Sequence, residues 1–187
     1  MTEGCGTVAG YAVTAQIRSA QTPILGHTYL RHTEWWSDIE AAGTPRIVVI
    51  EDTDLVPGYG ACVGQVAAAA FGALGCRGAV TNGSGRDIDA LSKMGFALFA
   101  ASVSPSRAYA HVVAHSCEVD IFGLRVRPGD LLAADRHGVL LIPPHEALRV
   151  CEAAAELVGR KRTFVEFCSS PDFSLNGLKE QLDRFHS

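Results

Sequence analysis

The chain has 187 residues, of which 48% are hydrophobic and 19% are charged, so it has the composition of a globular protein and not that of a disordered one. Its formal net charge of −4 argues against nucleic acid as a main partner, because binding to a phosphate backbone needs a concentrated basic surface. The sequence has neither a signal peptide nor an apolar run of the roughly 18 residues that span a bilayer, so we expect a cytoplasmic protein that does not bind a membrane.

Six cysteines are scattered along the chain without a C-x-x-C pair. They are Cys5, Cys62, Cys76, Cys117, Cys151 and Cys168. A disulfide framework is unusual in a chain of this size without a secretion signal, and no zinc-binding spacing is present. We therefore expect reduced thiols that mostly pack as small hydrophobic side chains.

The first hundred residues alternate between predicted strands and predicted helices. Runs rich in β-branched residues predict strands over residues 8–17, 46–51, 78–81 and 96–103. Helices are predicted over residues 65–74 and 88–94, ended by Gly75 and Gly95. Glycine-rich segments predict a loop at 57–60 and a turn at 82–85, and residues 24–40 have no clear pattern. This alternation is typical of an α/β layer.

The remaining residues change in character. Short strands split by turns are predicted over residues 111–119, 121–126, 131–134 and 139–142. They form a β-meander joined to the α/β layer, so we expect a layered α/β fold with a mixed central sheet. Two C-terminal helices are predicted over residues 144–167 and 174–185. We expect one domain over residues 1–187, with residues 143–187 as a helical extension.

Two glycine-containing loops of the α/β layer hold the residues best suited to chemistry. Each loop follows a strand and leads into a helix, and such loops gather at the carboxyl ends of strands, where ligands bind. The backbone amides of Val63, Gly64 and Gln65, at the start of a predicted helix, suit a carboxylate or a phosphate. The glycines at 58, 60 and 64 do not have the spacing of a dinucleotide-binding loop.

Arg86 and Asp87 follow the second loop directly. An arginine can hold a carboxylate or a 2-oxo acid through paired hydrogen bonds, and an aspartate can bind Mg²⁺. Two structural interpretations compete with this one. The pair can form a salt bridge within the loop, or Asp87 can cap the helix that starts at Ile88. The spacing alone does not decide between these interpretations.

The residues Gly64-Gln65 and the stretch Gly78–Asp87 resemble the core of the RraA-like family, which includes class II pyruvate aldolases acting on 4-hydroxy-4-methyl-2-oxoglutarate. Gly10–Thr14 resembles the first core strand of that family. Arg127–Val139 is similar to its second signature, a hairpin with the pattern P-G-D and then D-x-x-G. Together these similarities run from about residue 10 to residue 145, and they imply the RraA-like layered fold.

The resemblance also implies roles for single residues. Asp87 would bind a Mg²⁺ or Mn²⁺ ion otherwise held by water and substrate. Arg86 would bind the keto and carboxylate oxygens of the substrate and stabilise the enolate that forms. The amides that would hold the substrate carboxylate are those of Val63, Gly64, Gln65 and Val66. The family forms trimers or hexamers in which a neighbour's C-terminal region adds a carboxylate, for which Glu166 is the candidate here.

Three features of the chain depart from the family pattern. Gln65 stands where the aldolases have an acidic residue, and an amide cannot accept the proton that retro-aldol cleavage removes. Decarboxylation of oxaloacetate mainly needs an electron sink at the keto group and depends less on that base. Asn82 stands where the family commonly has an aspartate. The sequence also begins almost at the first core strand, without the family's N-terminal helices.

The sequence therefore predicts a divalent-metal-dependent lyase that cleaves or decarboxylates a small 2-oxo acid to give pyruvate. Arg86 and Gln65 are the predicted catalytic residues and Asp87 the predicted metal ligand. One alternative is a catalytically silent RraA-like protein that regulates a ribonuclease by binding to it. Another is an enzyme with a different substrate, such as a hydroxylated sugar acid.

A few other residues invite a functional interpretation. His111 and His115 share one face of a predicted strand and suit either a metal site or ordinary strand positions. Ser84 lies between two glycines, but the five-residue pattern of a nucleophile elbow is absent. Trp35 and Trp36 suit a subunit contact or a core position equally well.

Overall fold

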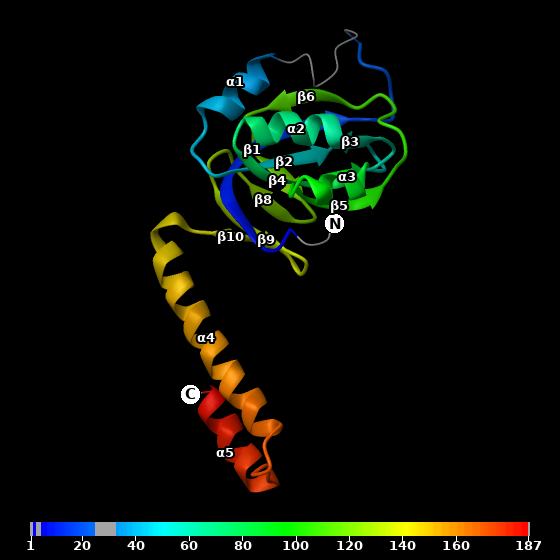
Figure 1. Cartoon of the computed structure of the whole chain (residues 1–187). Coiled ribbons are helices and arrows are strands. Elements are labelled where there is room, and N and C mark those ends of the chain that lie inside the picture. The colour runs from blue at the N-terminus through cyan, green and yellow to red at the C-terminus, as the bar shows by residue number, and fades with distance from the viewer. Residues whose placement is uncertain (1, 3–4, 25–32, 187) are drawn as a thin grey trace. The chain divides into compact units, whose positions relative to one another are not determined.

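The computed structural model describes residues 2, 5–24 and 33–186. It divides into two compact units, Met1–Ile142 and Pro143–Ser187, and each is described by itself. The division falls where the sequence predicts the start of a helical extension. Figure 1 shows the elements of both units.

The strands and helices of the first unit follow the predicted order. Its strands are β1 (Val8–Arg18), β2 (Arg46–Asp52), β3 (Ala61–Val63), β4 (Cys76–Gly85), β5 (Ala97–Val103), β6 (His111–His115), β7 (Val119–Ile121), β8 (Leu124–Val126), β9 (Leu131–Asp135) and β10 (Gly138–Ile142). Its helices are α1 (Thr33–Ala41), α2 (Gln65–Ala73) and α3 (Ile88–Lys93). Strands and helices alternate up to β5 except that β3 follows β2 directly, and short strands follow β5.

An eight-stranded mixed sheet forms the centre of this unit. Its order is β10-β9-β1-β2-β4-β3, with β5 also paired to β4 and β6 also paired to β1. The pairs among β1, β2, β3, β4 and β5 are parallel, whereas β6 and β9 run antiparallel to β1. The predicted β-meander takes the form of separate hairpins, since β7 and β8 make a small sheet of their own. The mixed α/β fold is therefore confirmed.

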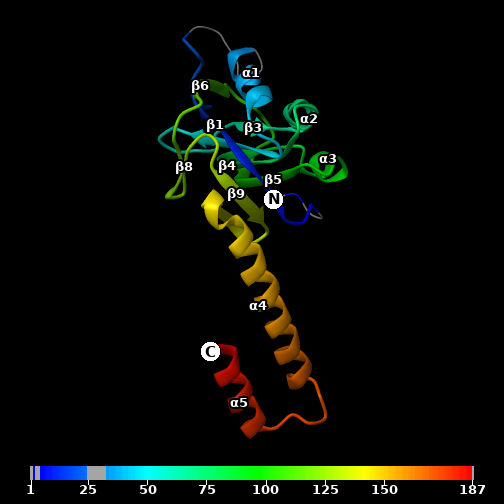
Figure 2. The ribbon, with the colours of Figure 1, turned by 90° about the vertical axis from the view of Figure 1, so that its left-hand side faces the viewer.

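Hydrophobic side chains cover both faces of the sheet. On β2, Val48 and Ile50 point to one face and Ile47 and Val49 to the other, as the period of a strand requires. The first face packs against α1, α2 and α3, and the second against the β7–β8 hairpin and β9. Figure 2 shows α2 and α3 on one side of the sheet and β8 on the other. Trp35 is fully buried in the first of these cores, beside Phe71.

A buried arginine at the start of β2 joins the ends of two helices. The guanidinium of Arg46 donates to the carbonyl oxygens of Glu40 and Ala42 at the end of α1, and to that of Leu74 at the end of α2. Helix C-termini leave such carbonyls without partners inside the helix, and they carry partial negative charge. One cation therefore satisfies both helix ends.

The predicted turn at residues 82–85 is wrong, because β4 continues to Gly85. The strand stays paired because Asn82 bridges it to β2: its side-chain oxygen accepts from the amide of Asp52 at 2.6 Å and its side-chain nitrogen donates to the carbonyl of Asp52 at 3.1 Å. Gly85 serves packing and not a turn, since a Cβ there would collide with Leu98. Strand β3 and helix α1 were not predicted.

The second unit is a helical hairpin. A short 3₁₀ turn (Pro144–Glu146) leads into α4 (Ala147–Cys168), and α5 (Leu175–His186) follows, so both predicted helices are confirmed. The helices meet through aromatic pairs, with ring centroids 5.8 Å apart for Phe164 and Phe185. In the part of the chain that the structure describes, no helix combines the length and the apolar character that a membrane crossing requires.

Candidate active site

Arg86 and Asp87 lie where β4 ends, next to the start of α2. The amide of Arg86 donates to the carbonyl of Val63 at 2.9 Å, which fixes the end of β4 beside β3. The amide of Gln65, the first residue of α2, donates to Oδ2 of Asp87 at 2.9 Å. The two glycine-containing loops predicted from the sequence therefore lie side by side. Gln65 of the first loop contacts Asp87 of the second.

Gly64 makes this close approach possible. A Cβ at position 64 would lie 2.7 Å from Nε of Arg86, 2.8 Å from its Cγ and 2.8 Å from Oδ2 of Asp87. Real Cβ atoms do not come so near to other heavy atoms, so a side chain at this position would displace both neighbours. The backbone of Gly64 is extended, with φ −143°, and it is the lack of a side chain that the site needs here.

Asp87 does not cap α3 with its side chain. It occupies the N-cap position in the left-handed conformation, with φ 57°, and its carboxylate makes no capping hydrogen bond. That interpretation of the sequence is therefore wrong. The carboxylate turns instead toward α2 and forms a salt bridge with Nε of Arg86 at 3.7 Å, so the interpretation as a salt bridge within the loop is confirmed; the side-chain exposures are 42% for Asp87 and 33% for Arg86. Both charged groups remain open to solvent.

The amides at the start of α2 are only partly used by the protein itself. Asp87 accepts the amide of Gln65, so the carboxylate held by this helix end is in part the chain's own. The amides of Val66 and Ala67 belong to the first turn and have no acceptor within the helix. A second anion can therefore bind the same helix end beside Asp87.

The carboxylate of Asp87 fits a metal that keeps most of its water. Among the described residues, no donor hydrogen-bonds to its second oxygen, Oδ1, and no group of three His, Cys, Asp or Glu side chains surrounds a common point. Mg²⁺ commonly takes one or two protein carboxylates and completes its shell with water and substrate oxygens. One exposed carboxylate beside an anion-binding helix end matches that kind of site.

The side chain of Gln65 lies exposed at the first position of α2. Its backbone, and not its side chain, makes the contact with Asp87. A side-chain amide can orient water or substrate but cannot take up a proton at neutral pH. The side chain of Gln65 therefore offers hydrogen bonds at this surface but no basic group.

A buried hydrogen-bond network around Asp52 was not predicted from the sequence. Asp52 and Asp54, at the end of a predicted buried strand, were the feature that could have indicated it. Asp52, only 2% exposed, accepts the amides of Gly58 at 2.8 Å and Asp54 at 3.1 Å. Burial raises the pKa of Asp52, and the hydrogen bonds from Gly58 and Asp54 oppose that rise. The carbonyl of Gly58 accepts from Ser84 at 2.6 Å, on the strand that ends in Arg86. The network therefore fixes the loop that leads to β3 and α2.

Buried thiols near the site are not nucleophiles. Burial raises the pKa of the Cys62 thiol to about 12, so it stays protonated at neutral pH. Cys62, Cys76, Cys117, Cys151 and Cys168 are free thiols, as predicted, but the expectation that most of the six cysteines pack as small hydrophobic side chains is wrong, because only Cys62 and Cys76 are buried. Ser84 is also fully buried, and its hydroxyl contacts Gly58 and Ser102 and no histidine within the described residues. Neither group forms a nucleophilic site.

The remaining candidates lie apart from one another. Nδ1 of His111 contacts the carbonyl of Tyr109, whereas Nδ1 of His115 contacts Asp38 at 2.8 Å. The two histidines therefore have separate partners. Glu166 lies exposed on α4 and pairs with Arg162 at 3.8 Å.

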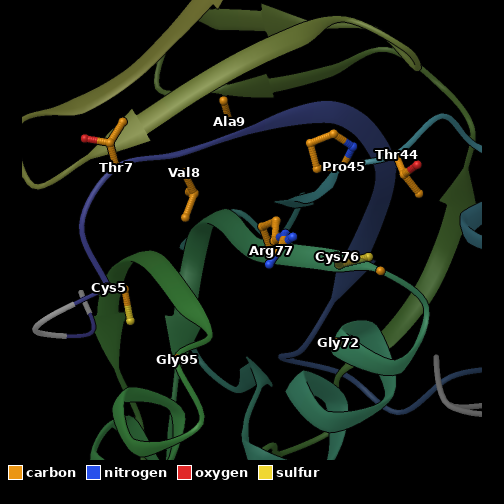
Figure 3. Close-up of a pocket in the computed structure, with 11 residues that line it drawn as sticks. Cys5, Thr7, Val8, Ala9, Thr44, Pro45, Gly72, Cys76, Arg77 and Gly95 are labelled. Carbon is orange, nitrogen blue, oxygen red and sulfur yellow. The ribbon is translucent and has the colours of Figure 1, made fainter.

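An open cavity of about 860 Å³ lies elsewhere, at the amino-terminal ends of β2 and β4. Figure 3 shows small side chains such as Thr7, Thr44 and Pro45 around it. Among the described residues that line it, Arg77 alone is charged. These residues bring together no opposite charges comparable to Arg86 and Asp87, so we place the candidate active site at the carboxyl ends of the strands.

Comparison with known protein families gives one match over most of the chain. Residues 1–141 match the model of the RraA-like family, described as Aldolase/RraA. The match covers the whole sheet unit up to β10 and includes Gly64, Gln65, Arg86 and Asp87.

Solved structures share the fold. An uncharacterised protein from Pseudomonas syringae pv. tomato str. DC3000 aligns with a TM-score of 0.74 and 21% identity, covering 98% of this chain and 78% of that one. Streptomyces coelicolor RraAS2, an unusual member of the RNase ES inhibitor RraA protein family, aligns with a TM-score of 0.65 and 22% identity over 84% of this chain and 76% of that one. RraA from Thermus thermophilis, an RNA-processing inhibitor, aligns with a TM-score of 0.55 and 22% identity over 74% and 77%.

Proposed function

Because the chain belongs to the RraA-like family, we propose that it is a divalent-metal-dependent lyase that releases pyruvate from a small 2-oxo acid. One observation carries the proposal: Arg86 and Asp87 lie against Gly64, and Asp87 is bound to the first amide of α2. A guanidinium, a carboxylate and a helix N-terminus thus share one solvent-open surface. These are the groups that binding and polarising a 2-oxo acid requires.

Each group has a role in this proposal. The guanidinium of Arg86 binds the keto and carboxylate oxygens of the substrate and stabilises the negative charge that develops on the keto oxygen. The free amides at the start of α2, with those of Val63 and Gly64, hold the carboxylate of the pyruvyl part. Gln65 orients the substrate or a water molecule. Asp87 would hold Mg²⁺ or Mn²⁺, and the bound metal would supply further positive charge at the keto oxygen.

Decarboxylation suits these residues better than aldol cleavage. When oxaloacetate loses its distal carboxylate as CO₂, the electron pair of the broken carbon–carbon bond enters the enolate of pyruvate. That enolate then takes a proton from water, and no protein base is needed. Retro-aldol cleavage requires removal of a hydroxyl proton, for which Gln65 is unsuited. We therefore propose oxaloacetate decarboxylation as the main activity.

The proposal also covers the setting of the enzyme. It is a cytoplasmic homotrimer or hexamer that acts on a small 2-oxo acid and has neither nucleic acid nor membrane as a partner. Residues 143–187 form a helical extension of one RraA-like domain, and Glu166 of a neighbouring copy is the candidate for an additional carboxylate at the site.

Pyruvate release from oxaloacetate, measured with and without Mg²⁺ or Mn²⁺, tests the proposal. We expect metal-dependent release by the wild type, and a fall in kcat/KM of about 100-fold or more in Arg86→Ala and Asp87→Asn. Two exposed residues, Arg77 and Asp89, provide the matched controls Arg77→Ala and Asp89→Asn, which should keep the wild-type rate. Gln65→Glu should gain aldolase activity toward 4-hydroxy-4-methyl-2-oxoglutarate.

A second candidate function is regulation of a ribonuclease by binding. The side-chain amide of Gln65 in place of a base favours it, and two of the proteins with this fold are described as inhibitors of RNase or RNA processing. Absence of metal-dependent turnover across a panel of 2-oxo acids and hydroxylated sugar acids, together with a complex with ribonuclease E that slows RNA cleavage, would replace the lyase proposal with this one.

A further inference from the structure

An apolar groove of about 420 Å³ lies on the sheet face opposite α2 and α3. Its floor is formed by β4 and β5, and its walls by the β7–β8 turn and the β9–β10 turn. The side chains that make it apolar are Val80, Phe99, Ile121, Phe122, Leu124 and Val139. This face of the sheet is therefore covered by the β7–β8 hairpin on one side but stays open over β4 and β5.

Phe122 stands at the rim of this groove in an unfavourable conformation. It and Gly123 form the two-residue turn between β7 and β8, with φ values of 55° and 87°. Such a turn favours Asn-Gly, because asparagine tolerates positive φ far better than a bulky side chain does. Phe122 as a whole residue is also 74% exposed. The backbone conformation at position 122 disfavours phenylalanine, and the side chain is not buried against the described residues. Neither factor therefore explains why phenylalanine occupies this position.

Beside its turn the β7–β8 hairpin carries Asp120, opposite Arg125 on the paired strand, and the groove wall carries Arg136. Asp120 lies exposed two residues before Phe122, and it accepts the amide of Gly123 at 2.6 Å. Arg136 lies exposed in the opposite wall of the groove and forms no ion pair with any described residue. One chain thus carries an aromatic ring with an acid beside it, and an apolar hollow with a base beside it.

We propose that the groove of one copy of the chain receives the β7–β8 turn of a second copy. Phe122 then packs against Val80 and Phe99 of the other copy, and Asp120 faces Arg136. Burial of the exposed ring offsets the unfavourable backbone conformation at the turn. The chain carries both complementary halves, which points to a second copy rather than to an unrelated ligand. This inference does not depend on the catalytic proposal.

Sedimentation over a range of concentrations tests the inference with Phe122→Asn. We expect association to weaken by about 30-fold or more, as for a central aromatic contact. At a dilution where both proteins are dissociated, the variant should melt about 2–4 °C higher, because asparagine fits the turn. Met94→Asn is the matched control: Met94 is 43% exposed at the end of α3, on the other side of the sheet, and its replacement should leave association unchanged.

A charge exchange tests the orientation. Arg136→Asp should weaken association by about 5-fold, and adding Asp120→Lys should restore most of that loss, because the exchanged charges attract again. Since Asp120 also accepts the amide of Gly123, recovery in the double variant is the informative result. A wild-type chain that stays monomeric, a Phe122→Asn variant that associates like the wild type, or a double variant that shows no recovery overturns the inference.

Discussion

Asp87 illustrates how one residue can serve a site through a contact that local sequence does not reveal. Its position before a short helix suggested a cap, yet its carboxylate binds the amide of Gln65 at 2.9 Å in another helix. The left-handed backbone of Asp87, at φ 57°, turns the side chain in that direction. Non-glycine residues seldom adopt this conformation, and where they do, the surrounding structure has to hold them. Here Gln65 and Arg86 do so.

Replacing Gly64 by alanine adds one methyl group and tests whether the close approach of Arg86 and Asp87 to Gly64 matters for activity. In Gly64→Ala, the new Cβ would lie 2.7 Å from Nε of Arg86 and 2.8 Å from Oδ2 of Asp87, so both side chains must shift. A displacement of about 1 Å at a reacting group costs on the order of 100-fold in rate. We expect that loss in kcat/KM for pyruvate release, with the far-ultraviolet circular dichroism spectrum unchanged.

The same exchange a few residues later is the control. A Cβ on Gly72, inside α2, meets nothing within 4 Å. Alanine favours a helix over glycine by about 1 kcal/mol, so Gly72→Ala should unfold at a slightly higher urea concentration and keep full activity. Equal activity in the two variants would show that the contact at Gly64 does not shape the site.

At the scale of elements, polar side chains join helices to strands, and the hydrophobic pattern of the sequence does not predict these contacts. Arg46 ties the ends of α1 and α2 together, and Asp38 ties α1 to the end of β6. The carboxylate of Asp38 accepts from the hydroxyl of Ser116 at 2.5 Å and contacts Nδ1 of His115 at 2.8 Å. These contacts hold α1 over the sheet in addition to the burial of Trp35.

The contact between Ser116 and Asp38 makes a prediction about pH. The hydrogen bond from Ser116, followed by the contact with His115, lowers the pKa of Asp38 below its usual 3.8. A lowered pKa in the folded protein stabilises it above the unfolded value of about 3.8, and this stabilisation disappears as pH falls through the folded pKa. Ser116→Ala should therefore reduce stability at pH 7 by about 0.5 kcal/mol, since both groups are partly exposed, and by much less near pH 2.

Urea unfolding of wild type and variant at several pH values measures this difference. Ser37→Ala is the matched control, because the hydroxyl of Ser37 on the same helix donates to the carbonyl of Thr33 and, within the described residues, to no carboxylate. Its effect on the unfolding midpoint should not vary with pH. A Ser116→Ala deficit that is equally large at pH 2 and pH 7 would contradict the role given to Asp38.

At the scale of the whole molecule, we expect the proposed metal to contribute to chemistry and little to folding. A structural metal site surrounds its ion with several protein ligands, and removal of the ion unfolds the domain. Here the protein offers one exposed carboxylate, that of Asp87, and no cluster of three acidic, histidine or cysteine ligands among the described residues. The core of unit 1 rests instead on hydrophobic side chains from both faces of the sheet.

Metal removal tests this division of roles. Treatment with EDTA should abolish pyruvate release, and added Mg²⁺ should restore it. The thermal midpoint should change by less than about 2 °C, because weak binding to the folded state adds little free energy. A large drop in the midpoint on chelation would mean that the metal is a structural part of the fold.

Much of the fold could be predicted because it depends on local patterns. The run Arg46–Glu51 is β-branched enough to be a buried strand on its own, and Gly75 and Gly95 end their helices with positive φ as expected. The course of β4 past Asn82 could not be predicted, because it depends on the side chain of that residue bonding to the backbone of Asp52, 30 positions away. The glycine-rich segment of β4 resembles a turn in the sequence, but it forms a strand because Asn82 bonds to a distant part of the backbone.

The sequence by itself determined the alternation of strands and helices, the C-terminal helices and the presence of Arg86 and Asp87 next to each other. These features follow from periodicity and residue type, which act over a few neighbouring positions. Only the tertiary structure decided what Asp87 binds, why Gly64 must lack a side chain, and how Asp52 holds the loop before α2. The contacts of Asp87 and Gly64 join segments about 22 positions apart, and their geometry depends on how the parallel strands bring the loops to one edge of the sheet, whereas Asp52 acts on a loop only six positions away.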